Sequence, residues 1–154
     1  MKIFIGILFL IISTYVGYRA SLKYTLRKKY YKDFFQFNSS LKNNVRFTLD
    51  SINKTIESFL NKGDFIRLFL LIINDKKHVG YVIKYLNNDE NEFMYNYVNS
   101  IGKTDRESQL NYLIYVEGEI SQKLKKSEED EKKYKQLYVK LGFLFGLVVL
   151  VLLL

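Results

Sequence analysis

Residues 141–154 read LGFLFGLVVLVLLL, and residues 3–18 read IFIGILFLIISTYVGY. Neither run contains a charged residue, and twelve of the fourteen residues in the first are Leu, Val or Phe. At about 1.5 Å per helical residue the runs reach about 21 and 24 Å, somewhat less than the roughly 30 Å hydrocarbon core of a bilayer. The C-terminal run lengthens to Tyr138 if Lys140 extends its ammonium group to the interface. We therefore predict two transmembrane helices, residues 1–20 and 141–154.

Each apolar run has an alternative interpretation. The N-terminal run could be a cleaved secretory signal, but a cut after Ala20 places Tyr18 where a small residue is needed, and basic residues follow directly. The C-terminal run could be a buried core helix, as runs under 18 residues often are. Its large apolar residues leave no polar face, which argues against a soluble core. An uncleaved anchor and a second span are therefore favoured.

Positive charge is concentrated beside the first apolar run. The chain carries 24 Lys and Arg against 16 Asp and Glu, a net charge of +8. Because basic residues near a span stay in the cytoplasm, we expect residues 21–140 inside the cell and both termini outside. The second span is oriented in the same way by Lys132, Lys133, Lys135 and Lys140. Anionic membrane lipids are favoured over nucleic acid as the partner of this charge. The juxtamembrane basic cluster comprises Arg19, Lys23, Arg27, Lys28, Lys29 and Lys32.

The middle of the chain has the pattern of a helical domain. Apolar residues recur three or four positions apart from Tyr30 to Phe59, which predicts a helical stripe that breaks near residues 43–50. The run after Asp64 predicts a helix buried almost all round, with a strand as the alternative. Residues 79–86 form an element of uncertain type, and a further helix begins at Asn88. The absence of proline from all 154 residues favours long helices.

The last predicted helix is the longest. Thr104 and Glu107 have the spacing of a capping box, in which each side chain binds a backbone N–H group at the start of a helix. Nothing between Thr104 and Leu154 would stop that helix, so we expect one continuous helix that enters the membrane. The four consecutive acids at residues 128–131 point to different sides of a helix, and we expect them to be solvated.

The sequence contains no recognisable catalytic or cofactor site. There is no cysteine and only one histidine, His78, which we expect to lie on the surface. The eight glycines never form a phosphate-binding loop. We therefore predict no enzyme activity, no metal and no cofactor.

Glycines do mark the two apolar runs. Gly142 and Gly146 are four residues apart, which allows close approach of another helix. Gly6 and Gly17 are eleven apart and therefore share a face. We expect these two faces to pack together.

The segment from Gly102 resembles the stage III sporulation protein AB family. The resemblance rests on the block Gly102-Lys103-Thr104-Asp105-Arg106-Glu107-Ser108-Gln109, on the residues 134–138 and 141–147, and on Gly17, Arg19 and Ala20 after the first span. It covers both ends and about the last 50 residues. By this resemblance Gly102, Asp105, Arg106, Glu107 and Gln109 are structural residues or partner contacts.

The family is similar to the cytoplasmic domain of type II secretion and type IV pilus platform proteins. The resemblance implies an all-α antiparallel bundle of about six helices, in the mother-cell membrane around the forespore of an endospore-forming bacterium. It also implies a channel complex whose partners are a secretion-type ATPase, stage III sporulation protein AA, and other stage III proteins, with homo-oligomers as a further possibility. The alternatives are a small pore-forming or holin-like membrane protein and a membrane-tethered nucleic-acid binder.

Overall fold

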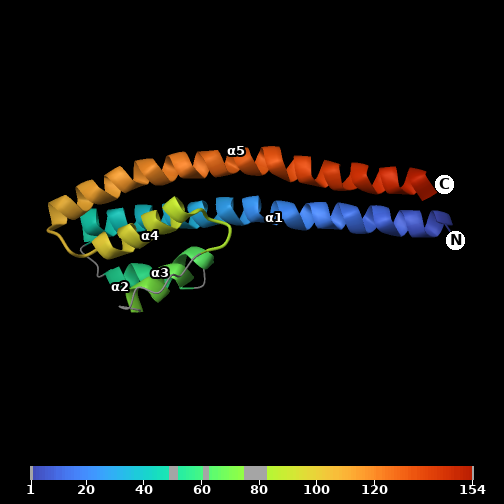
Figure 1. The fold of residues 1–154 in the computed structure, drawn as a ribbon. Coiled ribbons are helices and arrows are strands. Elements are labelled where there is room, and N and C mark those ends of the chain that lie inside the picture. Colours follow the sequence, from blue (N-terminus) through green and yellow to red (C-terminus); the bar gives the residue numbers. More distant parts are fainter. Residues whose placement is uncertain (1, 49–51, 61–62, 75–82, 154) are drawn as a thin grey trace. The chain divides into compact units, whose positions relative to one another are not determined.

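The computed structural model describes residues 2–48, 52–60, 63–74 and 83–153. Most of these residues are helical, and no strand occurs among them. The elements in chain order (Figure 1) are α1 (Lys2–Asn43), the π-helix η1 (Asn44–Thr48), α2 (Ile52–Phe59), α3 (Asp64–Asn74), α4 (Asn88–Ser100) and α5 (Arg106–Leu153). The all-α prediction is confirmed, but the described residues form five α-helices rather than about six.

The chain divides into two packing units. Unit 1 comprises Met1–Lys28 and Lys126–Leu154, and unit 2 comprises Lys29–Lys125. Helices α1 and α5 contribute residues to both units, whereas α2, α3 and α4 belong to unit 2. These limits describe packing, while the predicted limits at residues 20 and 140 describe the edges of membrane spans.

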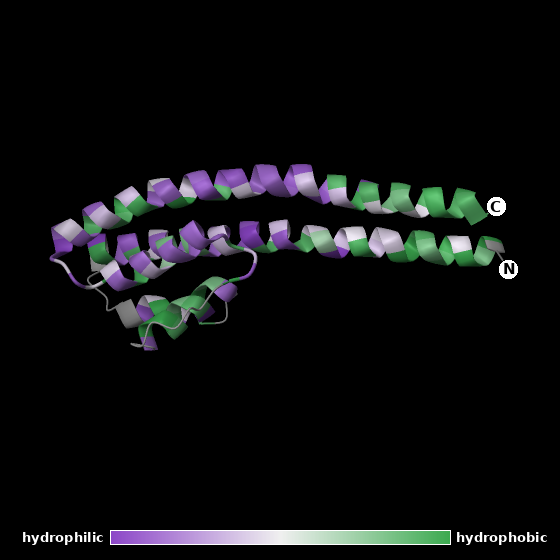
Figure 2. Cartoon of the chain, in the orientation of Figure 1, coloured by the Kyte–Doolittle hydropathy of each residue, from purple (hydrophilic) through white to green (hydrophobic). Residues whose placement is uncertain are grey.

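The two longest helices carry the apolar runs. Helix α1 has 42 residues and α5 has 48, and α5 is unbroken, as the sequence predicts. Apolar residues predominate at the N-terminal end of α1 and the C-terminal end of α5 (Figure 2). Each helix is long and apolar enough to cross a membrane, and only 6% of each apolar segment is buried. The core helix of a soluble protein would be mostly buried, so the low burial favours two spans.

The shorter helices follow the predicted pattern with two differences. The break near residues 43–50 appears as the end of α1 and the π-turn η1, and the helix predicted from Asn88 is α4. The run after Asp64 is helical rather than a strand, but Leu71 and Ile73 are 37% and 44% exposed, so α3 is not buried all round. His78 lies outside the described residues, as does the first half of the element predicted at 79–86.

The core of unit 2 is rich in aromatic residues and receives side chains from all five α-helices. Phe34 is fully buried; its ring stacks on Phe65 with centroids 4.6 Å apart and meets Tyr97 edge to face at 4.7 Å. The predicted stripe of α1 supplies this core. A buried polar contact joins α1 to α5, because the Asn38 amide donates a hydrogen bond to the Leu113 carbonyl at 3.0 Å.

Candidate functional site

The apolar ends of α1 and α5 meet at glycine residues in unit 1. A Cβ atom added to Gly17 would lie 2.4 Å from the backbone oxygen of Tyr138 and 3.3 Å from the Cα of Gly142. A Cβ atom added to Gly142 would lie 2.5 Å from the backbone oxygen of Ser13. Only glycine permits so close an approach of two helix backbones. The structure therefore brings together Gly17 and Gly142, two of the glycines that the sequence singles out.

The close contact continues toward both chain ends. A Cβ on Gly146 would lie 2.6 Å from the Cα of Leu10, and one on Gly6 would lie 2.3 Å from a methyl group of Leu150. Contacting residue numbers rise along α1 as they fall along α5, so the two helices are antiparallel here. We call this contact the glycine seam: Gly6, Ser13, Gly17, Gly142 and Gly146.

The glycine seam sets the relative depth of the two charge-free runs. The run of α1 ends at Tyr18 and that of α5 begins at Leu141. Because Gly17 faces Gly142, these two ends lie at the same level of the helix pair. Charged residues of both helices therefore begin at one level, as they must if a membrane surface passes there.

Beyond this level lies a cluster of tyrosines. The ring of Tyr24 stacks on Tyr134 with centroids 4.9 Å apart, and the Tyr138 centroid is 6.0 Å away. The Lys23 ammonium lies 5.0 Å from the centre of the Tyr24 ring. Burial, followed by the interaction with Tyr138, raises the pKa of Tyr24. Tyrosine and lysine together are typical of a membrane–water interface.

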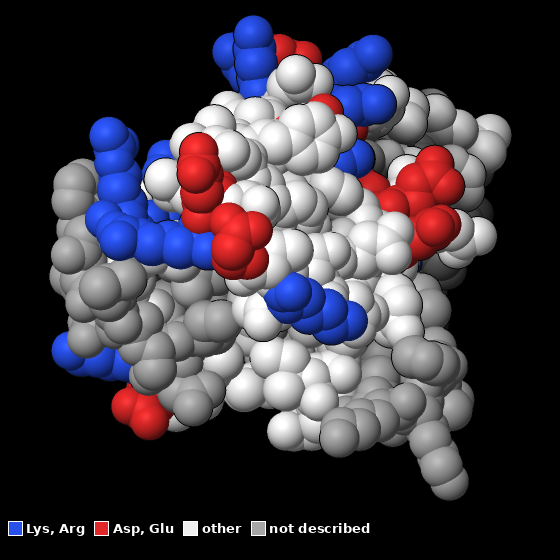
Figure 3. All heavy atoms as spheres, turned by 90° about the vertical axis from the view of Figure 1, so that its left-hand side faces the viewer, with Lys and Arg blue, Asp and Glu red and all other residues white. Residues whose placement is uncertain are grey.

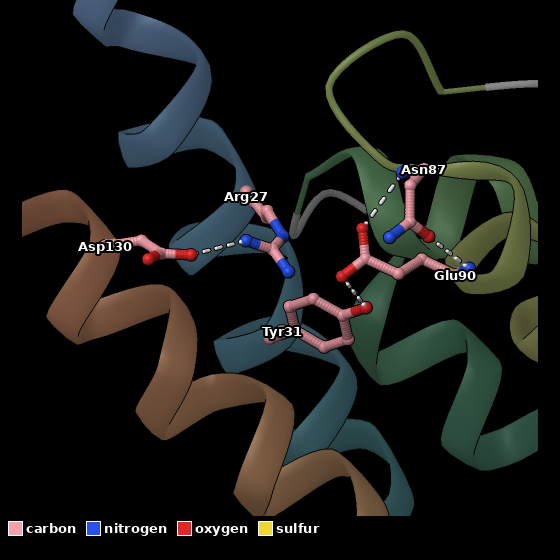
Figure 4. Close-up of polar contacts among 5 residues, drawn as sticks. All are labelled: Arg27, Tyr31, Asn87, Glu90 and Asp130. Carbon is pink, nitrogen blue, oxygen red and sulfur yellow. Dashed lines mark hydrogen bonds and ion pairs between the residues drawn. The ribbon is translucent and has the colours of Figure 1, made fainter. Parts of the chain in front are cut away.

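Two members of the juxtamembrane basic cluster are paired with acids of α5. Arg27 contacts Asp130 at 2.8 Å (Figure 4), and their side chains are only 16% and 24% exposed. Lys28 pairs with Glu131, whose side chain is 13% exposed. Burial alone would raise the pKa of Glu131, but the hydrogen bond of Lys28 and the positive charges of Lys28 and Lys135 act against it, and the pKa is lowered. The prediction that residues 128–131 are solvated is wrong for these two acids, because each faces a base on α1.

The remaining members of the basic cluster are exposed to solvent. Sequence reasoning treated all six bases alike because nothing in the local pattern shows which of them face α5. The antiparallel register supplies that information, since Arg27 and Lys28 lie opposite Asp130 and Glu131 once Gly17 is set against Gly142. The exposed members are Arg19, Lys23, Lys29 and Lys32.

In unit 2 the block from Gly102 to Gln109, here called the family block, builds the turn before α5. The helix begins one residue later than predicted: Asp105, not Thr104, is the capping residue, and its carboxylate accepts a hydrogen bond from the Ser108 backbone N–H at 3.0 Å. The side-chain and backbone hydrogen bonds of Ser108 lower the pKa of Asp105. Aspartate is as good a cap as threonine and adds a negative charge at the positive end of the helix, which explains the shift.

The other block residues are also bound within unit 2. Gly102 adopts a φ of 76°, and its N–H donates to the side-chain oxygen of the buried Gln109 at 2.9 Å. The Arg106 guanidinium donates to the backbone oxygens of Val45 at 2.9 Å and Arg46 at 2.5 Å, in the π-turn that ends α1. Glu107 is exposed. The block is thus largely structural.

Glu90 is a buried acid that sequence reasoning missed. Its two carboxylate oxygens accept hydrogen bonds from the Tyr31 hydroxyl at 2.8 Å and from the Asn87 N–H at 3.0 Å (Figure 4). The Asn87 side chain in turn accepts from the Glu90 N–H, which completes a capping box at the start of α4. The N-x-x-E spacing was the available signal. Glu90 therefore has a structural role.

The described part of the chain offers no evident catalytic centre. Within it, no group of three or more His, Asp or Glu side chains could hold a metal ion. Basic and acidic side chains are interspersed over one face of the molecule, with uncharged surface between them (Figure 3). The feature with the most distinctive geometry is the glycine seam together with the charged and aromatic residues where its apolar runs end.

Comparison with known proteins gives one match. The family model described as Stage III sporulation protein AB matches residues 2–154. No curated protein and no solved structure matches the chain.

Proposed function

Because the chain belongs to the stage III sporulation protein AB family, we propose that it is a non-enzymatic platform component of the channel complex between mother cell and forespore. Family membership gives it a role in stage III of sporulation. In our proposal it lies in the mother-cell membrane around the forespore and binds a secretion-type ATPase, stage III sporulation protein AA, and other stage III channel proteins.

The membrane part of the proposal rests on the position of the charged residues, which begin at the same level in α1 and in α5. Two spans that enter a bilayer as a pair need their charged ends on the same side and at the same depth. The contact between Gly17 and Gly142 provides this. Arg19 and Lys23 of α1 then share that side with Lys140 of α5, and the excess of basic residues assigns it to the cytoplasm. Both termini are then outside the cytoplasm.

The surface of α5 in unit 2 supports a protein-binding role. Ile114 and Tyr115 are 51% and 65% exposed, which leaves apolar area that a partner would cover. Gly118, one turn further along, has open space where a side chain would be. Most of the family block is used within the fold, so we assign the ATPase contact to this outward face of α5.

Cysteine labelling in whole cells tests the topology. The chain has no cysteine, so Ser121→Cys, at an exposed position of α5, introduces the only thiol. In cells that express the chain but form no forespore, an impermeant thiol reagent should label this chain only after the cells are permeabilised, whereas a cysteine appended after Leu154 should react in the intact cells. The opposite pattern would overturn the orientation and the ATPase contact.

Co-purification from sporulating cells tests the partner. The native chain should retain the secretion-type ATPase, and the double variant Ile114→Ser/Tyr115→Ser should lose it while its melting temperature stays unchanged. The matched control Ser121→Ala, on the same helix, should retain the ATPase. An ATPase that remains bound to the double variant would exclude this face, and one absent from the native chain would refute the partner.

A further inference from the structure

Two adjoining shallow hollows lie next to the glycine seam in unit 1. They measure about 380 and 370 Å³, and Thr14 and Phe143 line both of them. Almost all of the exposed lining is apolar. The Thr14 hydroxyl donates to the Leu10 carbonyl at 2.7 Å, so this side chain presents no unmatched donor to hydrocarbon.

Two side chains that end in polar groups contribute their apolar parts to the hollows. Lys140 lines one hollow and Tyr18 lines the other, and no acidic residue lines either. Arg19 directly follows Tyr18 and is exposed. Tyr18, Arg19 and Lys140 are all exposed, so their polar ends can reach the head group of a ligand whose hydrocarbon chain lies in the apolar hollows.

We propose that these hollows bind one acyl chain of an anionic phospholipid, with its phosphate held by Lys140. The acyl chain contacts Thr14 and Phe143, and the Tyr18 hydroxyl donates to the head-group oxygens. Charge decides between lipid classes: the acyl part fits any phospholipid, but a net negative head group is attracted to Lys140 and Arg19. This site rests on the membrane insertion proposed above, and it adds a specific lipid position to a generally basic surface.

Tryptophan fluorescence provides the test, because the native chain has no tryptophan. Phe143→Trp places a reporter in the hollows. Phe145→Trp places one at almost the same depth on another side of α5, where the native ring is 66% exposed. Each chain is reconstituted in vesicles that contain brominated phosphatidylglycerol or brominated phosphatidylcholine, and bromine quenches an adjacent tryptophan.

Quenching of the tryptophan at residue 143 should show an apparent affinity for brominated phosphatidylglycerol about fivefold higher than for brominated phosphatidylcholine. This is the effect of one basic residue at an anionic membrane surface. The reporter at residue 145 should be quenched equally by both lipids. Adding Lys140→Gln should abolish the preference at 143, whereas Lys132→Gln should not. Equal quenching of both reporters by both lipids, or a preference that survives Lys140→Gln, would overturn the site.

The same design separates this site from membrane insertion. If neither reporter is quenched by either brominated lipid, the apolar segments are not in the bilayer, and the insertion proposal fails together with the site. A second measurement avoids the added indole ring: phosphatidylglycerol should raise the melting temperature of the native chain more than that of Lys140→Gln. An equal increase in both chains would contradict the site.

Discussion

Replacing Gly17 with alanine adds one methyl group at the closest approach of α1 and α5. That methyl carbon would lie 2.4 Å from the Tyr138 oxygen and 3.2 Å from its carbonyl carbon. An ordinary contact of this type begins at 3.4 Å. The neighbouring atoms belong to the helix backbone and cannot rotate away. The two helices must therefore separate by about 1 Å at this point (3.4 − 2.4).

The energetic cost of this separation can be bounded. A gap of 0.5–1 Å removes about a quarter to a half of the dispersion energy of each contact, and overpacking generally costs about 1–3 kcal/mol. Alanine returns up to about 1 kcal/mol through its higher helix propensity. We expect a net loss of about 2 kcal/mol, because backbone atoms of α5 meet the new methyl group directly.

The separation of the helix pair can be followed by pyrene fluorescence. Phe4 and Leu152 are both highly exposed and lie near the Gly6 contact. Each is replaced by a cysteine that carries a pyrene label, and excimer emission from the two labels reports that α1 and α5 are in contact. Titration with SDS then gives the free energy of opening for the native pair and for Gly17→Ala. Gly118→Ala is the matched control, since its added methyl group meets no atom within 4 Å.

The control should not lower the SDS midpoint, and in a thermal melt it should stabilise α5 by about 0.5–1 kcal/mol. The same substitution thus has opposite effects at the two glycines. If Gly17→Ala leaves the midpoint unchanged or raises it, the close packing of the two helices does not depend on this glycine, and our explanation of the seam is refuted.

Three further substitutions test the other contacts. Phe34→Ala should lower the free energy of unfolding by about 3–5 kcal/mol, because the fully buried ring leaves a cavity; a denaturant titration in detergent measures the loss. Asp130→Asn should cost about 1 kcal/mol at low salt and less at high salt, because it removes one charge of the half-buried pair with Arg27; melting temperatures at two salt concentrations measure it. Asp105→Ala should lower the melting temperature at neutral pH but not in acid. The Ser108 hydrogen bonds lower the pKa of Asp105 below its ordinary 3.8, so the stabilisation is complete above that value and disappears as the pH falls through the folded-state pKa.

Each substitution has a control. Tyr115→Ala, at a side chain that is 65% exposed, should change stability by less than about 0.5 kcal/mol, and a loss as large as that of Phe34→Ala would contradict the core assignment. In a chain that already carries Arg27→Gln, Asp130→Asn should lower the stability by little more. A further loss as large as the one in the native chain would exclude the ion pair. Asp105→Asn keeps a capping side chain and should preserve neutral-pH stability. A difference between Asp105→Ala and the native chain that persists in strong acid would contradict the linkage to this carboxylate.

Periodicity predicted most helices because it reflects which residues face the core. The spacing of Tyr30, Phe34 and Leu41 placed the buried face of α1, and the lack of proline allowed α5 to run unbroken from Arg106. The start of α5 was wrong by one residue, since Thr104 and Asp105 are both good caps and sequence spacing does not show which one the chain uses. The side of α3 that stays exposed could not be predicted either, because its apolar residues surround the helix.

The sequence by itself determined the elements of this protein: two charge-free runs, a basic cluster beside the first, and long helices in a chain without proline. These are local properties, fixed by propensity and hydropathy. Only the tertiary structure decided which residues meet. It set Gly17 against Gly142, paired Arg27 with Asp130, and placed Arg106 and Gln109 in hydrogen bonds within unit 2. The pairings of α1 with α5 depend on the register of two helices that are far apart in the chain, and register is set by close packing, which the pattern along one helix does not encode.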